Sequence, residues 1–235
     1  MIRACATAGV LVLLGIAAAP ATPPATATIP GPSGEHLQYA VNWPSGLNLG
    51  ELDIQATRSG SKLNFEGTLD ASIPGFDIHD HYRSAATQEF CSTEFGKEFH
   101  HGSKAGDETT TFDLAGSMLT RLNKNGATGT AATGPCPKDA LDYIYFVRNE
   151  LAHGRLPQQQ LVYFGAAYNV RLDFGGAQKI RVAGADTDTD RITANVHGPA
   201  SDFAIQIFFA HDAARTPVLA RVPVSVGTLS LELMK

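Results

Sequence analysis

The sequence lacks several features that would point to a particular chemistry. Its 235 residues include only three cysteines, three methionines and one tryptophan. It has no C-x-x-C redox motif and no G-x-S-x-G nucleophile elbow. After the first twenty residues, no segment approaches the eighteen or more consecutive apolar residues of a membrane-spanning helix. These absences argue against thiol redox chemistry, against an α/β-hydrolase, and against a membrane span in the mature chain.

Basic residues are also scarce relative to acidic ones. The formal net charge is −5 at pH 7, with 18 Lys and Arg against 23 Asp and Glu. A negative balance disfavours binding to nucleic acid or to anionic membrane surfaces. We therefore expect no nucleic-acid partner.

The N-terminus has the composition of an export signal. Arg3 precedes an apolar stretch over residues 4–19, and Ala19 and Ala21 provide a small-x-small cleavage site. We predict a signal peptide at 1–21, a disordered Pro/Ala/Thr leader at 22–34 and a single β domain at 35–235. The mature protein is expected to be periplasmic or secreted.

Most of the remaining sequence alternates apolar and polar residues with the period of β-strands. We count roughly twelve strands. The alternation changes phase at Gly50, which predicts a β-bulge. We predict a two-residue hairpin at Gly175 and Gly176, and a surface loop over residues 127–134. The alternating aspartates of residues 186–190 lack the Gly and Glu of a calcium loop, and we predict a polar turn there.

One segment alone has helical periodicity. Asp139 suits the N-cap position and Asp142 places a second negative charge in the first turn. Gly154 and Pro157 mark the end of the helix. A lone amphipathic helix must pack on a sheet, so the predicted fold is mainly β: a strongly curved antiparallel sheet or open β-barrel with one packed α-helix at about 139–153. Arg148 and residues 212–215 are expected to dock this helix onto the C-terminal strands.

Cys91 and Cys136 are the two cysteines of the predicted mature chain. In an oxidising compartment two cysteines usually pair, so we predict a disulfide between the strand region and the base of the helix. The alternative is a pair of buried free thiols.

Three segments carry a family resemblance. They are LQYAVNWPSGLNLGELDI at residues 37–54, KDALDYIYFVRNELAHG at 138–154 and FFAHDAARTPVLARVPVSVGTLSLEL at 208–233. Their order and spacing resemble the bacterial family called domain of unknown function 3108. The resemblance implies an exported, mostly β protein, and it brings no activity to transfer. The two cysteines and the histidine-rich middle lie outside the family pattern.

Four histidines are candidate metal ligands. His79 and His81 share one face of a predicted strand, and His100 or His101 could add a ligand from the next strand, as in zinc or copper sites. The alternative is a solvated polar strand face. On the metal interpretation the protein would be a metal-dependent hydrolase built on the His79/His81 strand. Otherwise we predict no cofactor and no catalytic residue.

Aromatic residues indicate a shared interior. Trp43, Phe65, Tyr143, Phe146 and Tyr163 are the candidate ligand-binding residues if helix and sheet leave a gap between them. If no gap exists, they form ordinary core. The leading interpretation is a non-enzymatic envelope protein that binds a hydrophobic or glycan ligand, such as a lipid, or a protein partner in that space.

Overall fold

The computed structural model describes residues 34–73, 76–126, 128–199, 201–224 and 227–234. The predicted signal peptide and all but the last residue of the predicted leader lie outside these ranges. Within the described part of the chain, no helix combines the length and hydropathy required to cross a bilayer.

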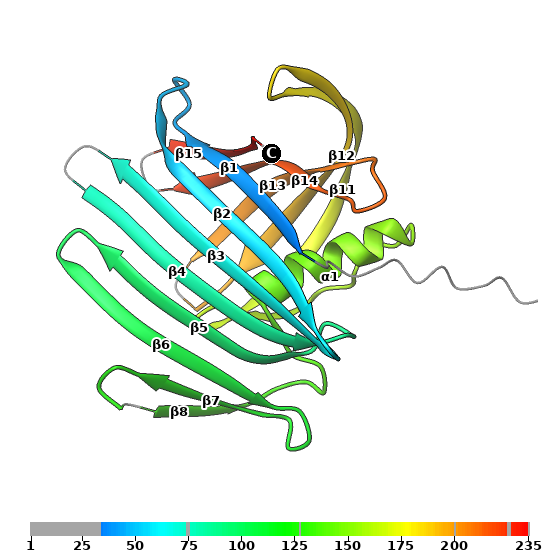
Figure 1. The fold of residues 1–235 in the computed structure, drawn as a ribbon. Helices are drawn as coiled ribbons and strands as arrows, with labels where there is room; N and C mark the ends of the chain where they lie inside the picture. The colour runs from blue at the N-terminus through cyan, green and yellow to red at the C-terminus, as the bar shows by residue number, and fades with distance from the viewer. Residues whose placement is uncertain (1–33, 74–75, 127, 200, 225–226, 235) are drawn as a thin grey trace, which may run out of the picture.

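The described residues contain one large β-sheet of fifteen strands (Figure 1). Its order is β8-β7-β6-β5-β4-β3-β2-β1-β15-β14-β13-β12-β11-β10-β9, so nearly every strand pairs with its neighbour in the sequence. The pairs are antiparallel, except that β9 and β10 run parallel. The strands are β1 (Glu35–Asn42), β2 (Asn48–Ser59), β3 (Lys62–Ile73), β4 (Phe76–Thr87), β5 (Ser92–His101), β6 (Lys104–Asp113), β7 (Met118–Asn123), β8 (Thr128–Ala132), β9 (Lys138–Asp139), β10 (Gln160–Tyr163), β11 (Ala167–Val182), β12 (Ala185–His197), β13 (Asp202–Ala210), β14 (Pro217–Val224) and β15 (Gly227–Leu233).

The sheet curls around the helix but does not close into a barrel (Figure 1). Its two ends meet at several contacts. The Ser92 backbone N–H at the start of β5 donates to the Pro137 carbonyl oxygen before β9 at 2.8 Å, and the Phe112 ring on β6 packs edge-on against the Tyr163 ring on β10 at 5.4 Å between centroids. The Arg121 guanidinium on β7 donates to the Gly165 carbonyl oxygen after β10. The predicted mainly β fold with an open, strongly curved sheet is confirmed.

A bulge near Gly50 contributes to this curvature. The β1–β2 register shifts between Val41 and Asn42, opposite Gly50. Gly50 has φ of +153°, and a Cβ there would lie 2.0 Å from the Asp70 carbonyl oxygen. Only glycine fits such a backbone approach. The predicted bulge is confirmed.

The predicted hairpin at Gly175 and Gly176 is wrong. Strand β11 runs through both glycines, and its register with β12 shifts between Phe174 and Ala177. Two glycines that permit a turn equally permit a bulge, and here the long strands on both sides continue to pair. The chain instead turns after Val182, at Ala183 and Gly184, both with positive φ.

Two further expectations need correction. We predicted a polar turn at the aspartates of residues 186–190. They lie on strand β12 instead, and the turn comes before that strand. Residues 127–134 contain strand β8, which pairs with β7. Strand β8 lies at the edge of the sheet and buries few of its side chains. Its threonine, glycine and alanine residues therefore show no alternation of apolar and polar types. Short strands of this kind explain why roughly twelve were predicted where the described residues form fifteen.

Helix α1 (Ala140–Ala152) lies within the curl of the sheet (Figure 1). The Asp139 side chain accepts hydrogen bonds from the backbone N–H groups of Leu141 and Asp142, as an N-cap does. Gly154 follows the C-terminus with φ of +70°. The predicted helix and both of its ends are confirmed, and Asp142 in the first turn is fully buried.

Cys91 and Cys136 form a disulfide, with 4.7 Å between their Cα atoms. The bond joins the turn between β4 and β5 to the segment that leads into β9 and the helix. The predicted pairing is present.

Candidate functional site: the space between helix and sheet

One face of α1 is packed tightly against the N-terminal half of the sheet. The Tyr145 ring stacks on the Phe65 ring of β3 with 4.5 Å between centroids. Both belong to a buried cluster with Ala56, Leu63 and other side chains of β2 to β4. Phe65 is 2% exposed and Leu63 is fully buried. Side chains therefore fill the space on this side.

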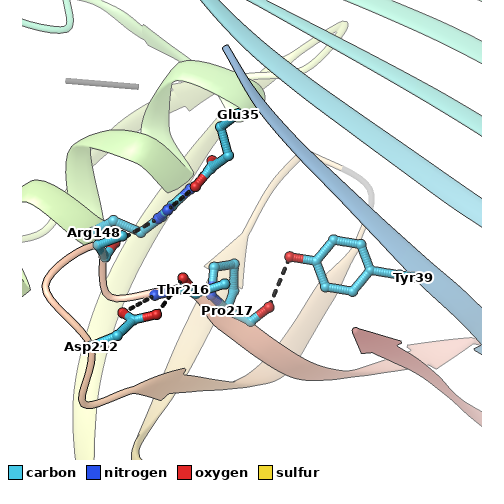
Figure 2. Close-up of polar contacts among 7 residues, drawn as sticks. Glu35, Tyr39, Arg148, Asp212, Thr216 and Pro217 are labelled. Atoms are coloured by element: carbon cyan, nitrogen blue, oxygen red, sulfur yellow. Dashed lines mark hydrogen bonds and ion pairs between the residues drawn. The ribbon is translucent and has the colours of Figure 1, made fainter. Parts of the chain in front are cut away.

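An ion pair fixes the C-terminal part of the helix (Figure 2). Both terminal nitrogens of Arg148 donate to the two carboxylate oxygens of Glu35 on β1, each at 2.6 Å. The Arg148 Nε donates to the Ala214 carbonyl oxygen at 3.0 Å, and the guanidinium lies over the Tyr145 ring. Burial tends to raise the pKa of Glu35, but the Arg148 hydrogen bonds and charge outweigh it and lower that pKa. Bidentate, charge-assisted bonds of this kind hold a helix in one position.

The loop that receives Arg148 has internal bonds of its own (Figure 2). Asp212 accepts hydrogen bonds from the Thr216 backbone N–H and hydroxyl, at 2.9 and 2.7 Å. The Tyr39 hydroxyl of β1 donates to the Pro217 carbonyl oxygen at 2.8 Å. Arg148 and residues 212–215 do dock the helix, as predicted, but the loop accepts through a backbone carbonyl and the carboxylate partner is Glu35. Sequence reasoning missed Glu35, which is 113 residues away from Arg148.

Buried polar groups anchor the N-terminus of the helix to β4 and β5. The Ser84 hydroxyl donates to the Asp139 carboxylate at 2.6 Å, and the Ser92 hydroxyl donates to Asp142 at 3.1 Å. Burial raises the pKa of Asp139 to about 6. Burial and the nearby Asp139 charge raise the pKa of Asp142 well above its usual value. The Lys138 ammonium donates to the Phe90 carbonyl oxygen, and burial lowers its pKa. None of the cavities described below is lined by these two carboxyl groups, so we interpret the cluster as an anchor.

The opposite face of α1 borders a pocket of about 520 Å³. The helix contributes Ala140, Tyr143, Ile144 and Val147, and Phe164 and the inward-facing positions of β10 to β14 contribute the rest. Every lining side chain is apolar or, for two tyrosines, mostly apolar. The lining residues are Ala140, Tyr143, Ile144, Val147, Val162, Phe164, Tyr168, Val170, Leu172, Ile192, Ala194, Val196, Phe203, Ile205, Ile207, Phe209 and Val222.

The lining of this pocket is chemically compatible with hydrocarbon. No charged side chain lines it. Burial raises the pKa of the Tyr143 hydroxyl to about 12, so that group stays neutral; Gln160 is the polar side chain beside it. Concave, largely apolar cavities of a few hundred Å³ are the usual form of small-molecule sites.

The structure brings only one of the five predicted ligand-binding aromatics to this pocket. Tyr143 lines it. Phe65 is stacked in the packed cluster, and Phe146 packs under the Lys138 ammonium at 4.5 Å. Tyr163 lines a separate cavity of about 200 Å³ near Arg121. Trp43 is half-buried in the turn after β1.

Sequence reasoning missed the aliphatic lining of the pocket. Those residues were recognised as strand, and their alternation on β11 to β13 placed them on one face. What could not be predicted was that a cavity remains between this face and the helix, beside residues of both that pack together in a buried cluster. The sequence feature that indicates this lining is the set of inward-facing Val, Leu, Ile and Ala residues at positions 170, 172, 192, 194, 205 and 207.

Three of the four candidate metal-binding histidines, His79, His81 and His100, line one hollow of about 360 Å³ on the outer face of β4 and β5. His79 and His81 contact the carboxylates of Asp70 and Glu66 at 2.7 and 2.8 Å, and the His100 ring stacks beside His79. His101 points to the other face of the sheet, where it contacts Asp80. Among the described residues, no group of three or more His, Cys, Asp or Glu side chains is arranged to hold a metal ion.

An open, curved sheet around one helix, with an apolar pocket between them, defines the chain as a β-barrel-like protein. The family model described as "Protein of unknown function (DUF3108)" matches residues 38–234. The chain belongs to this family, as the resemblance of its three segments predicted.

A solved structure has the same fold. It is described as a β-barrel-like protein of domain of unknown function DUF1849 from Brucella abortus. The match covers 86% of this chain and 96% of that one, with a TM-score of 0.60 and 8% sequence identity. At this identity the likeness concerns the fold alone. None of the curated proteins compared with the sequence matched it.

Proposed function

We propose that this protein is an exported, non-enzymatic binding protein that holds the hydrocarbon part of a lipid in the pocket between α1 and strands β10 to β14. The observation that carries the proposal is the apolar lining of the 520 Å³ pocket, which no charged side chain interrupts.

The magnitudes favour such a ligand. Burial of one methylene contributes about 0.8 kcal/mol, so a chain of about fifteen methylenes would gain roughly 12 kcal/mol before the costs of association. After association costs of about 4 kcal/mol, the remaining free energy of about 8 kcal/mol corresponds to affinities around the micromolar range. A lipid carrier requires binding of this order, because it must also release its ligand.

The same lining disfavours a glycan. Sugar hydroxyl groups that leave water need hydrogen-bond partners, and each unpaired group costs roughly 1–3 kcal/mol. Tyrosine hydroxyls are the only side-chain polar groups among the lining residues. A protein partner would also have to enter a concave space between a helix and a sheet.

Export is part of the proposal. It is supported by the signal-like composition of residues 1–21 and by the disulfide between Cys91 and Cys136, which suits an oxidising compartment. On this view residues 35–235 form the mature domain, preceded by the leader at 22–34.

The proposal can be tested with a variant that fills the pocket. Ala194 lines it and is buried, so Ala194→Trp places an indole where the hydrocarbon would lie. Thr193→Trp is the matched control, because its side chain points to the opposite face of β12. We expect wild type and the control to bind the neutral fluorescent probe N-phenyl-1-naphthylamine, and A194W to lose at least about tenfold in affinity.

Mass spectrometry of lipids extracted from the purified protein gives a second measurement. We expect acyl lipid with wild type and T193W, and much less with A194W. Equal probe binding by all three proteins, or no binding by wild type, would refute the proposed site.

A further inference from the structure

Apolar side chains continue beyond the pocket on the same concave face of the sheet. Val222 on β14 lines the pocket and lies directly opposite Leu229 on β15. Ile207 on β13, another pocket-lining residue, lies opposite Ala220, and Ala220 lies opposite Leu231. Side chains of directly opposed residues stand on the same face of an antiparallel sheet. The two leucines of β15 therefore share the face that forms the pocket.

We call this surface the apolar wall and define it as Ala220, Leu229, Leu231 and Val41. Leu231 lies opposite Val41, so the wall spans β14, β15 and β1, which are consecutive in the sheet (Figure 1). Val41 is 2% exposed, but Ala220 and the two leucines are only half-buried. The described residues thus leave part of an inward-facing apolar surface open to solvent. Contiguous apolar surface of this kind usually marks a binding site.

The wall lies beside the pocket and not at its end. Along β13 the pocket-lining residues run from Phe203 to Phe209, which in an extended strand corresponds to roughly 20 Å. Leu231 lies two strands away from Ile207, in the middle of that stretch, which corresponds to about 10 Å across the sheet. A second chain of the same molecule can lie there alongside the first, whereas one long chain would have to turn across the strands.

Trp43 borders the wall at the other end of β15. A Cβ on Gly227, the first residue of that strand, would lie 3.5 Å from the Cζ2 atom of the Trp43 ring. Trp43 is half-buried, and its indole combines a large apolar ring with one polar N–H, as is common where apolar surface meets water. This residue, which the sequence indicated as ligand-binding, therefore borders the wall instead of the pocket.

We propose that the ligand is a lipid with two hydrocarbon chains, one in the pocket and the other on the apolar wall. This inference rests on the proposed function and adds the class of ligand to it. The occupant follows from continuity, because the paired residues that join the wall to the pocket are all apolar. A second chain on the wall leaves water together with the leucines that it covers.

The test compares three probes with the same phosphocholine head group. Monooctanoylphosphatidylcholine carries one octanoyl chain and dioctanoylphosphatidylcholine carries two. Hexadecylphosphocholine carries a single chain that is about as long as the two octanoyl chains together. Each probe is used below its micelle-forming concentration and is titrated against bound N-phenyl-1-naphthylamine.

The probes are titrated into wild type, Leu231→Gln, Leu229→Gln and Ser230→Gln. Ser230 lies between the two leucines on β15 and its side chain points to the opposite face, so Ser230→Gln is the matched control. Thermal unfolding followed by circular dichroism verifies that each variant is folded. Two separate wall variants keep the test decisive if one of them does not fold.

We expect wild type to bind dioctanoylphosphatidylcholine at least about tenfold more tightly than the probe with one octanoyl chain. L231Q and L229Q should each weaken dioctanoylphosphatidylcholine about fivefold and leave hexadecylphosphocholine unchanged. S230Q should behave as wild type with all three probes.

Three results would overturn the assignment. If L231Q and L229Q change the binding of no probe, the wall holds no chain, the two-chain assignment is wrong and the proposed function stands. If they weaken hexadecylphosphocholine as much as dioctanoylphosphatidylcholine, one long chain crosses onto the wall and the assignment is again wrong. If neither these probes nor N-phenyl-1-naphthylamine binds wild type, both proposals fail.

Discussion

The two faces of helix α1 meet the same sheet in different ways. Toward β2 to β5, the Tyr145 and Phe65 rings stack at 4.5 Å, and hydrogen-bonded carboxyl groups tie the first turn to the strands. Toward β10 to β14, the helix leaves a space of about 520 Å³. The comparison shows that hydrogen bonds anchor the helix on one side, whereas the other side combines a buried apolar cluster with a cavity.

The physical reason lies in the residues on each side. The contacts that fix the helix are directional: hydrogen bonds to Ser84 and Ser92 on β4 and β5, a disulfide next to the helix start, and the bidentate ion pair of Arg148 with β1. The lining of the pocket is aliphatic and aromatic, and the attraction between such side chains has no preferred geometry. On that side the helix also packs in a buried apolar cluster with β10 to β13, and this packing leaves part of the space beside it unfilled.

The strongest test of the comparison truncates one phenylalanine on each side. Phe65→Ala removes a buried ring from the packed cluster and should lower the free energy of unfolding by about 4 kcal/mol. Phe203→Ala removes a half-buried ring that already borders the pocket and should cost about 1 kcal/mol. Urea denaturation measures both. Equal losses would mean that the two faces are packed alike.

Removal of the disulfide should have the next largest effect. The double variant Cys91→Ala, Cys136→Ala removes a bond between residues that are 45 positions apart in the sequence. Its loss should lower the free energy of unfolding by about 3 kcal/mol. Because the bond lies on the packed side, binding of the neutral probe to the folded double variant should persist. An unchanged unfolding midpoint, or loss of the probe site from a folded protein, would contradict this view.

Loss of the ion pair between Arg148 and Glu35 should lower the free energy of unfolding by a smaller amount. Arg148→Met leaves the partly buried Glu35 carboxylate without its partner and should cost about 2–3 kcal/mol. Adding Glu35→Gln should restore part of the loss, because the remaining side chain is neutral. Chemical denaturation of the two single variants and the double variant gives the coupling. Strict additivity would show that the pair does not hold the helix.

The raised pKa of Asp139 predicts that the free energy of unfolding depends on pH. Its pKa is raised to about 6 by burial, against an ordinary value of 3.8. The folded protein therefore binds a proton more readily than the unfolded chain between these values. The contribution of Asp139 to stability is complete below pH 3.8 and is lost as the pH rises through 6.

The measurement compares wild type with Asp139→Asn, whose side chain can still cap the helix and does not titrate. From pH 7.5 to 4.5, the free energy of unfolding should shift in favour of wild type by about 2 kcal/mol. A difference that is constant over this range would mean that the carboxyl group is not desolvated.

Sequence predicted the features that depend on neighbouring residues. Asp139 and Gly154 mark the helix because caps need only local backbone geometry, and Gly50 marks its bulge through a phase change in one strand. Gly175 and Gly176 misled because glycine pairs fit a bulge as well as a turn.

Features that depend on the whole sheet could not be predicted. The partner of Arg148 is Glu35, on the first strand, and no spacing rule connects the two. Of the aromatic residues chosen for ligand binding, Phe65 fills the packed side, whereas Tyr163 and Trp43 lie away from the pocket. Positions such as Ala194 and Ile205 line the pocket because the packing of the helix on β11 to β13 leaves a cavity there.

The open sheet has a mechanical consequence. Where its two ends meet, the β9 end is fixed to β5 by the Cys91–Cys136 disulfide and by a hydrogen bond from the Ser92 backbone N–H to the Pro137 carbonyl oxygen at 2.8 Å. Farther along, the contacts are the ring pair between Phe112 and Tyr163 and the arginine bond to the Gly165 carbonyl. The seam is therefore closed at one point by a covalent bond instead of a continuous strand ladder, and that bond limits how far the two edges of the sheet can part.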